Sequence, residues 1–534
     1  SALVYHMKRT TYFDRPPRIQ PDLPLGEHDI PRPPSKEDGG NMQLIQAALP
    51  LITIIGFIFV SSMGGGQSGG LVIPMALSVI AATGLAVFSY RREKQRQADK
   101  EQNYSERLLE LNKEMNNAHD QQRRFYRYNY PDSTTLEQIV LSAHHEAEKG
   151  QRTFRAETRL WERRVEDNDF GSVRLGMGTL PSTVVYRIND LEDMDDPQAR
   201  AAKKLATDSE FVTDIPIIIG LRQPREAKEN EAKPEDAEEA EATVARTPMT
   251  HAFGIAGERD AVYQFVHAML AHYVIFHAPM DAQLYLLSTS KAEWTWALQL
   301  PHLRADEQNT NTCFVEEVRE EKNSALPGET EGNELEQFLE NIRRALATRK
   351  IRLQDREENE GKDDPTIPFM LVVADLLDST YDEESLLKDL ESDAAITLLL
   401  AEGAMLGAAV IFLVPERSKV PTGCLSLVEI ERTTPATNSK SQQFQRLHFR
   451  YAEVGVNSFR YVGEADAFET AERIGSLAKQ LAQLEVRQGY GAQLASNVPF
   501  LDLMGYRTLG QLERDAWNKW QDSTKNEHSD WLRV

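Results

Sequence analysis

Two apolar runs near the N-terminus dominate the hydrophobic pattern of this chain. They span Leu44 to Val60 and Leu71 to Phe88, within a block from Asn41 to Tyr90 that carries no charge. Each run approaches the roughly 20 residues that a helix needs to cross a bilayer. A single run could be a buried core helix, but two runs joined by a glycine-rich turn predict a two-helix transmembrane hairpin over residues 41–90.

Cationic residues flank this block on both sides, and the turn between the runs has none. They are Lys8, Arg9, Arg15, Arg18 and Arg32 before it, and Arg91, Arg92, Lys94 and Arg96 after it. The positive-inside rule then places both termini in the cytoplasm and only the turn outside. Residues 1–40 are rich in proline, which predicts an extended cytoplasmic tail that could lie along another subunit.

Residues 91–150 have the pattern of a helical stalk. Apolar side chains follow steps of four and three, with one polar interruption at Gln122; they are Tyr104, Leu108, Leu111, Met115, Ala118 and Phe125. Such a seam is buried either in an antiparallel hairpin within the chain or in a coiled coil between chains. Pro131 ends the first helix, and Thr134 with Glu137 predicts a capping box for a second helix.

The remaining pattern divides into four regions. Residues 151–223 are a mixed α+β segment, and 224–248 form an acidic linker with eight carboxylates against two lysines between Glu226 and Glu241. From 249 to 486, apolar strands alternate with helices, which indicates a mainly parallel sheet covered on both faces. A last helix there is expected to begin after Asp466 as its N-cap. Residues 487–534 read as a connector.

Composition narrows the functional classes. The formal charge is −23, the wrong sign for a protein that tracks nucleic-acid phosphates. No nucleic-acid partner is therefore expected. Cys313 and Cys424 lack partners at metal-ligand spacing and are expected to be buried thiols.

The α/β region has the outline of a nucleoside triphosphatase but not its chemistry. Gly254, Gly257, Glu258 and Arg259 occupy the position of a phosphate-binding loop, and Asp375 ends a strand where such enzymes hold magnesium. The motif G-x-x-x-x-G-K-[ST] is absent from the chain, and the acidic neighbours of Arg259 repel phosphate. The sequence predicts a degenerate domain with no catalytic residue and no bound cofactor.

Other candidate chemistry is weaker. His267, His272 and His277 are spaced by five and do not share a helix face, so no metal site is expected. Ser288 and Ser290 lack a base at the spacing that a hydrolase triad needs.

Several motifs in this order resemble one family. They are Leu160 to Arg164, Asp169-Phe170, Val173 to Gly178, Gly254 to Arg259 and Trp294 to His302. With the proline-rich tail, the hairpin and the stalk, they resemble the N-terminal part of EccC, the membrane ATPase of type VII (ESX) secretion systems in the FtsK/SpoIIIE family. In that family a segment like Asp530 to Val534 leads into the first of several ATPase domains.

The resemblance implies a role in protein secretion at the bacterial plasma membrane. The chain would anchor and couple ATPase domains that bind ATP and magnesium, beside other core subunits and further copies of itself. Secreted helical-hairpin substrates would bind those distal domains. Trp161, Trp294 and Trp296 are expected in the core or at a subunit contact, as are Leu108, Leu111 and Met115. The alternatives are the anchor of an FtsK-type DNA translocase and a membrane scaffold without a motor.

Overall fold

The computed structural model describes most of the chain between residues 11 and 486. The described residues are 11–13, 15–16, 18–34, 55, 59, 69–149, 159–188, 196–222, 247–305, 310–315, 334–358, 367–377, 383–433, 446–454, 459–468, 470–486, 510, 514, 517 and 518. The predicted acidic linker and the connector fall almost entirely outside them.

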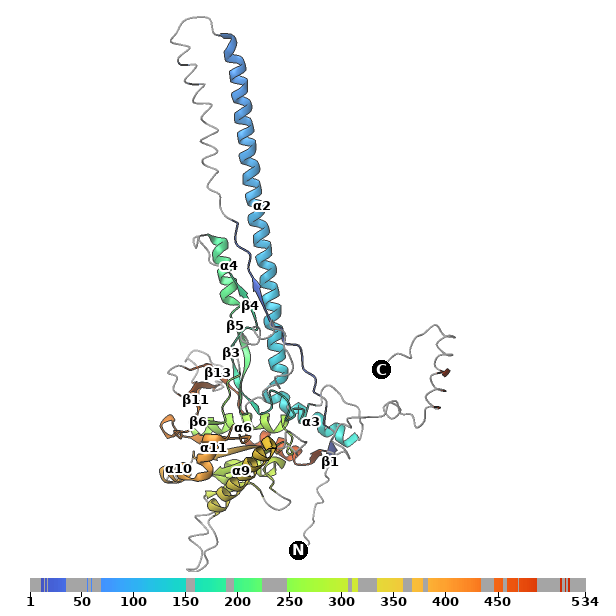
Figure 1. The fold of residues 1–534 in the computed structure, drawn as a ribbon, viewed down its shortest axis with the longest axis vertical. Helices are drawn as coiled ribbons and strands as arrows, with labels where there is room; N and C mark the ends of the chain where they lie inside the picture. Colours follow the sequence, from blue (N-terminus) through green and yellow to red (C-terminus); the bar gives the residue numbers. More distant parts are fainter. Residues whose placement is uncertain are drawn as a thin grey trace, which may run out of the picture.

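A ten-stranded sheet is the centre of the fold (Figure 1). In spatial order its strands are β5 (Phe211–Gly220), β3 (Ser172–Pro181), β13 (Tyr461–Ala465), β12 (Arg446–Glu453), β11 (Ser426–Thr433), β6 (Ala252–Gly257), β10 (Ala408–Val414), β9 (Phe369–Asp375), β7 (Ala282–Ser288) and β8 (Thr312–Phe314). The sheet therefore draws strands from both predicted regions, 151–223 and 249–486.

The prediction of a mainly parallel sheet is corrected to a mixed one. From β8 to β11 every neighbouring pair is parallel. From β11 to β5 every pair is antiparallel. The parallel strands β9 and β10 are buried at every position, as strands covered on both faces must be. In β12 buried positions largely alternate with half-buried or exposed ones, which suits an antiparallel strand with one face towards solvent.

Helices cover the two faces of the sheet with separate apolar cores. One core packs α6 (Arg259–Phe276), α3 (Ser133–Lys149) and α12 (Ala471–Leu481) against alternate strand positions, including Phe253 and Ile255. The other packs α9 (Glu334–Glu358), α10 (Glu383–Ser392) and α11 (Ala394–Glu402) against the intervening positions. Cys313 and Cys424 are free thiols buried in this second core, as the sequence predicts.

Helix α2 (Gly69–Asn129) runs for 61 residues and projects far from the sheet in Figure 1. Its backbone thus joins the second predicted span to the stalk without a break. Where the structure describes side chains, no helix is both long enough and apolar enough to cross a bilayer. Of the first predicted span only Ile55 and Phe59 are described, so the hairpin stays a prediction.

The apolar seam of the stalk is covered by this chain itself. Tyr104, Leu111 and Met115 are buried, and Leu108 and Ala118 pack beside them. Their partners come from β4 (Val184–Arg187) and α4 (Pro197–Asp208), and from Ile30, which directly follows β2 (Gly26–Asp29). Neither expected arrangement, an antiparallel hairpin or an intermolecular coiled coil, is what buries this seam in the described residues.

The polar interruption in the seam has a structural reason. Gln122 is 1% exposed, and its side-chain amide donates to the carbonyl of Pro181 at 3.0 Å. Its carbonyl oxygen accepts from the backbone N–H of Thr183 at 3.1 Å. A buried glutamine with both ends paired fixes the turn between β3 and β4 against the helix.

The proline-rich tail follows the chain's own surface rather than remaining free. Strand β1 (Thr11–Phe13) pairs in parallel with β14 (Leu484–Val486), and β2 pairs in parallel with β4. Ile30 is buried in the stalk core, and the Tyr104 hydroxyl donates to the carbonyl of Pro31 at 2.9 Å. Proline has no backbone N–H, but the residues beside the prolines of the tail can still form the hydrogen bonds of these strand pairs. The sequence pattern does not show which strands they pair with.

Two predicted helix starts are corrected. The N-cap of α3 is Asp132, whose Oδ1 accepts a hydrogen bond from the backbone N–H of Thr135 at 2.8 Å. Glu137 forms an ion pair with Arg473 at 2.8 Å instead of closing a capping box. The N-cap of α12 is Thr470, whose side chain makes no capping bond, whereas Asp466 lies four residues earlier and pairs with Arg174 at 2.5 Å.

Candidate functional site

Asp375 lies where a magnesium-binding carboxylate would lie, at the carboxyl end of the buried strand β9. Its side chain is fully buried. Ser288, at the end of β7, is its register partner on the neighbouring strand. The carboxyl ends of parallel strands meet at one edge of a sheet, which is where ligands bind in open α/β folds.

Donors of the protein itself occupy this carboxylate. Oδ2 accepts from the Tyr263 hydroxyl at 2.9 Å, the Ser288 hydroxyl at 2.7 Å and Nε1 of Trp294 at 2.7 Å. Oδ1 accepts from the N–H of Leu377 at 3.1 Å. Burial raises the pKa of Asp375, and these hydrogen bonds oppose that rise. The carboxylate is thus committed to four internal donors.

The turn that would hold phosphates is closed. Strand β6 ends at Gly257 and α6 begins at Arg259, so only Glu258 separates them. A Cβ on Gly257 would lie 2.4 Å from the carbonyl oxygen of Ile430, so the backbone passes close against β11. Gly254 faces Val420, whose side chain a Cβ there would meet at 2.6 Å.

The charged residues at this turn form ion pairs with residues of other segments. Arg259 contacts Glu293 at 3.6 Å and the Ser290 hydroxyl at 3.4 Å. Glu258 pairs with Arg432 at 3.4 Å. Glu258 and Glu293 place negative charge near this turn, and both oxygens of the Asp375 carboxylate accept hydrogen bonds from the protein.

Trp294 and Trp296 lie in the core beside this carboxylate. Their rings stack with centroids 6.0 Å apart, and both meet His267 edge to face. Nε1 of Trp296 donates to Nε2 of His267 at 3.2 Å. Burial lowers the pKa of His267 to about 4, so its ring is neutral and can accept this bond. The described contacts of both tryptophans are internal ones.

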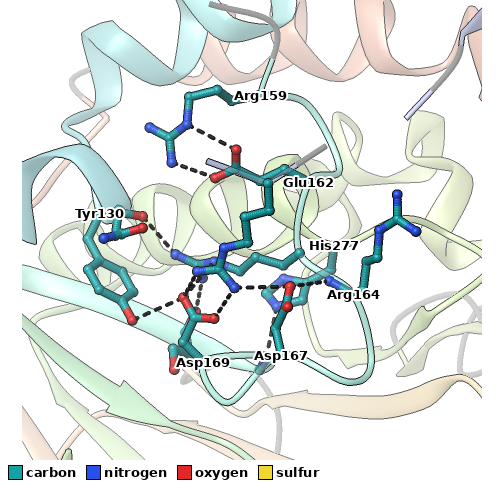
Figure 2. A network of polar contacts seen from close by, with 12 residues as sticks. Tyr130, Arg159, Glu162, Arg164, Asp167, Asp169 and His277 are labelled. Atoms are coloured by element: carbon teal, nitrogen blue, oxygen red, sulfur yellow. Dashed lines mark hydrogen bonds and ion pairs between the residues drawn. The ribbon is translucent and has the colours of Figure 1, made fainter. Parts of the chain in front are cut away.

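A second polar cluster joins the stalk base to the α/β body (Figure 2). Trp161 is fully buried; its backbone N–H donates to Ile275 at 2.7 Å and its indole to Val274 at 3.0 Å, both at the end of α6. It adopts φ of 56°, a left-handed conformation that is unusual for a bulky residue. These bonds outweigh the backbone strain and fix the loop against α6.

Arg163 is the buried centre of this cluster. Its guanidinium donates to the carbonyls of Asn129 at 2.7 Å, the last residue of α2, and Ser172 at 3.0 Å, the first of β3. It pairs with Asp169 at 3.3 Å and lies over the rings of Tyr130 and Phe276. One side chain thus ties the end of the stalk helix to the sheet.

The proline-rich tail supplies the other cation of Asp169. Arg18 forms a bidentate pair with the two oxygens of Asp169, with N–O distances of 2.5 Å, and also contacts Asp167 at 2.9 Å. Burial alone would raise the pKa of Asp169, but Arg163 and Arg18 outweigh it and hold that pKa at about 2. Arg15 adds an ion pair to Asp281 at 2.8 Å.

His277 completes the cluster without acting as a metal ligand. Its Nδ1 lies 2.7 Å from the carbonyl of Tyr273 and donates to it, while Nε2 accepts from the N–H of Gly171 at 2.8 Å. Burial lowers the pKa of His277 to about 3, so this neutral tautomer is the stable one. His272 lies buried against the ring of Tyr130. Within the described residues no three metal-ligating side chains converge.

Sequence reasoning did not find this cluster as a site. The run from Leu160 to Arg164 and the pair Asp169-Phe170 served only as family markers. Arg15 and Arg18 were used only to predict the orientation of the membrane hairpin. A cationic residue in a segment with few apolar side chains is expected to be solvated, and one sequence does not reveal a partner that lies more than a hundred positions away.

Comparisons with known proteins point to a class, the ESX secretion system proteins. No family model matches the chain. The particular protein it resembles is EccC, and the resemblance seen in the sequence is confirmed. The chain is 21% identical to EccC of Geobacillus thermodenitrificans over 516 residues, which is 95% of this chain and 29% of that protein.

Two further relatives agree. EccC of Thermomonospora curvata is 25% identical over 206 residues, 37% of this chain and 12% of the relative. The ESX secretion system protein YukB of Bacillus subtilis is 21% identical over 339 residues, 60% of this chain and 19% of the relative. This chain therefore spans less than a third of the length of each relative.

Solved structures of the Thermomonospora curvata protein were also matched. One is the cytoplasmic domain of the type VII secretion ATPase EccC, with 12% identity and a TM-score of 0.33 over 60% of this chain and 32% of that one. The other is its ATPases 2 and 3 in complex with a signal sequence peptide, with 14% identity and a TM-score of 0.30 over 60% of this chain and 48% of that one. Likenesses this distant carry no functional argument.

Proposed function

We propose that this chain is the membrane-anchoring and coupling part of a type VII protein-secretion ATPase. The observation that carries the proposal is the match of 95% of the chain to EccC of Geobacillus thermodenitrificans. The match includes the stalk and the α/β body together, not one domain alone. Other core subunits of the secretion complex and further copies of this chain are its proposed partners.

The anchor is residues 41–90, as a two-pass hairpin in the plasma membrane with both termini in the cytoplasm. Its support is the uncharged block in the sequence and the basic residues Arg91, Arg92 and Lys94 that follow it on α2. Those cations would lie at the surface of the inner leaflet, where anionic lipids attract them.

The coupling element consists of the stalk helix α2 and the proline-rich tail that runs beside it. Helix α2 continues for 61 residues, and the described tail runs back along the chain to the body, where Arg18 and Arg15 hold it. Helix α2 and the tail run in opposite directions between the membrane hairpin and the body, and together they resist bending better than the helix alone. A displacement of the body would therefore reach the membrane hairpin.

The chain itself is proposed to hydrolyse no ATP. Four internal donors satisfy the carboxylate of Asp375, and the turn at Gly257 leaves no room for a loop that wraps phosphates. ATP, magnesium and secreted substrates would then be handled by ATPase domains such as those in the relatives.

Membrane topology is the direct test of the anchor. In intact cells a membrane-impermeant maleimide should label Gly65→Cys, in the turn between the spans, but not Ser35→Cys before them. Both variants should react after the membrane is permeabilised. The native thiols Cys313 and Cys424 are buried and give a low background. Equal labelling of both variants in intact cells would refute the hairpin.

Calorimetry tests the absence of a nucleotide site. Titration of the purified full-length chain with ATP and magnesium should give no heat beyond dilution. Binding at micromolar concentrations would overturn the degenerate-site proposal. Duplex DNA at moderate salt serves as the second titrant, because tight binding would favour the DNA-translocase alternative.

A further inference from the structure

A cleft of about 1090 Å³ opens at the base of the stalk. Its walls come from the last turns of α2, the start of α3, strand β3 and the tail. Apolar surface predominates, from residues such as Tyr128, Pro131, Ile139 and Met177. The volume slightly exceeds the usual range for ligand pockets, about 300–1,000 Å³, which is enough for a short peptide segment.

Four arginines line this cleft, but three have internal partners. Arg159 pairs with Glu162, and Arg174 pairs with Asp466. Arg127 pairs with the exposed carboxylate of Asp214. The cleft's own carboxylate, Asp132, caps α3 through the N–H of Thr135.

Arg124 is the exception. It is exposed at the rim, one helical turn before Arg127, and within the described part of the chain it makes no hydrogen bond or ion pair. The cleft therefore combines an apolar floor with one available guanidinium. The complementary ligand is an apolar segment that carries one carboxylate, because a charge-assisted bond to arginine adds affinity and direction.

The sequence contains one such segment close by. Between Arg487 and Arg507 the only charged residue is Asp502, and apolar side chains surround it from Val498 to Met504. We propose that this segment of the same chain docks in the cleft, with Asp502 paired to Arg124. Docking would fix the connector to the stalk base, whether or not the chain acts in secretion.

The geometry of the connector permits this docking. The described chain reaches Val486 in β14, which pairs with β1, and β1 contacts α3. Asp502 lies sixteen positions after Val486, and this length of chain spans up to about 50 Å when extended. Helix α3 has 17 residues and is only about 25 Å long. The segment can therefore reach the cleft at the start of α3.

Photo-crosslinking on the full-length chain tests the proposal. A benzoylphenylalanine replaces Phe500, and isotopically light and heavy chains are mixed before irradiation. Mass spectrometry then identifies the joined peptides and separates links within a chain from links between chains. The expected product joins residue 500 to the peptide that contains Pro131 or Ile139 of the same chain.

Charge reversal makes the test specific. Arg124→Glu and Asp502→Arg should each lower the yield of this product about tenfold, as expected for loss of a charge-assisted bond, and the double variant should restore it. Arg107→Glu, on the same helix outside the cleft, is the matched control and should change nothing. Absence of the product, a yield insensitive to charge reversal, or links only between chains would each overturn the proposal.

Discussion

Nε1 of Trp294 donates a 2.7 Å hydrogen bond to Oδ2 of Asp375, the carboxylate that ends the buried strand β9. This bond fills the position at which a related fold would present a carboxylate to a metal ion. Both side chains are buried. The stability of the α/β body can be tested at this contact.

Replacing Trp294 by phenylalanine should destabilise the fold. The ring volume is largely kept, but a buried carboxylate loses one donor. The expected loss is about 1–3 kcal/mol in the free energy of unfolding, measured by urea denaturation. Trp296→Phe is the control, because it removes a bond to the neutral ring of His267 and should cost less. An equal or larger cost for Trp296→Phe would contradict the central role of Asp375.

Truncating a buried residue of the stalk seam should destabilise the fold of the single chain. Leu111 is 3% exposed, and Leu111→Ala should cost about 2–5 kcal/mol through loss of buried surface and a cavity. Leu109 is 69% exposed on the same helix, and Leu109→Ala should cost less than about 0.5 kcal/mol.

Light scattering on both variants checks which chain buries the seam. The oligomeric mass should be the same for Leu111→Ala as for the unchanged protein, because the partners of Leu111 lie in β4 and α4 of its own chain. A fall in mass specific to Leu111→Ala would instead indicate a contact between chains.

The tail should detach when its bidentate arginine is lost. Arg18→Ala removes the pairs to Asp169 and Asp167, and leaves the partly buried carboxylate of Asp169 with Arg163 and the hydroxyl of Tyr130. Amide hydrogen exchange of residues 18–34 should then become faster. Arg32→Ala, an exposed arginine of the same tail, should leave the exchange unchanged. Unaltered exchange in Arg18→Ala would show that β-pairing alone holds the tail.

Asp169 predicts a loss of stability in acid. Its folded pKa of about 2 lies below the ordinary aspartate value near 4, so its contribution is fully present above the unfolded value. The contribution is lost as the pH falls from about 4 to 2, and amounts to about 2 kcal/mol. Urea denaturation at pH 5 and pH 3 should show a smaller decrease for Asp169→Asn than for the unchanged chain.

The matched control is Asp208→Asn, an exposed carboxylate at the end of α4. It should follow the unchanged chain at both pH values. If Asp169→Asn lost as much stability in acid as the unchanged chain, the ion pairs to Arg163 and Arg18 would not be the source of the acid sensitivity.

The sequence by itself determined the local elements and the family resemblance. Runs such as Phe369 to Asp375 are apolar at nearly every position, and only a strand covered on both faces suits them. The period of the seam from Tyr104 to Met115 predicts one buried helix face. These signals are local, so one chain suffices to read them.

Tertiary structure alone decided what each buried face meets. It placed β4 and α4 on the stalk seam, paired Gln122 with the turn at Thr183, and brought Arg18 to Asp169 across 151 positions. It also filled the carboxylate of Asp375 with donors from three separate segments. Periodicity shows that a side chain is buried, but its partner depends on how distant segments pack, because hydrophobic burial has no direction of its own.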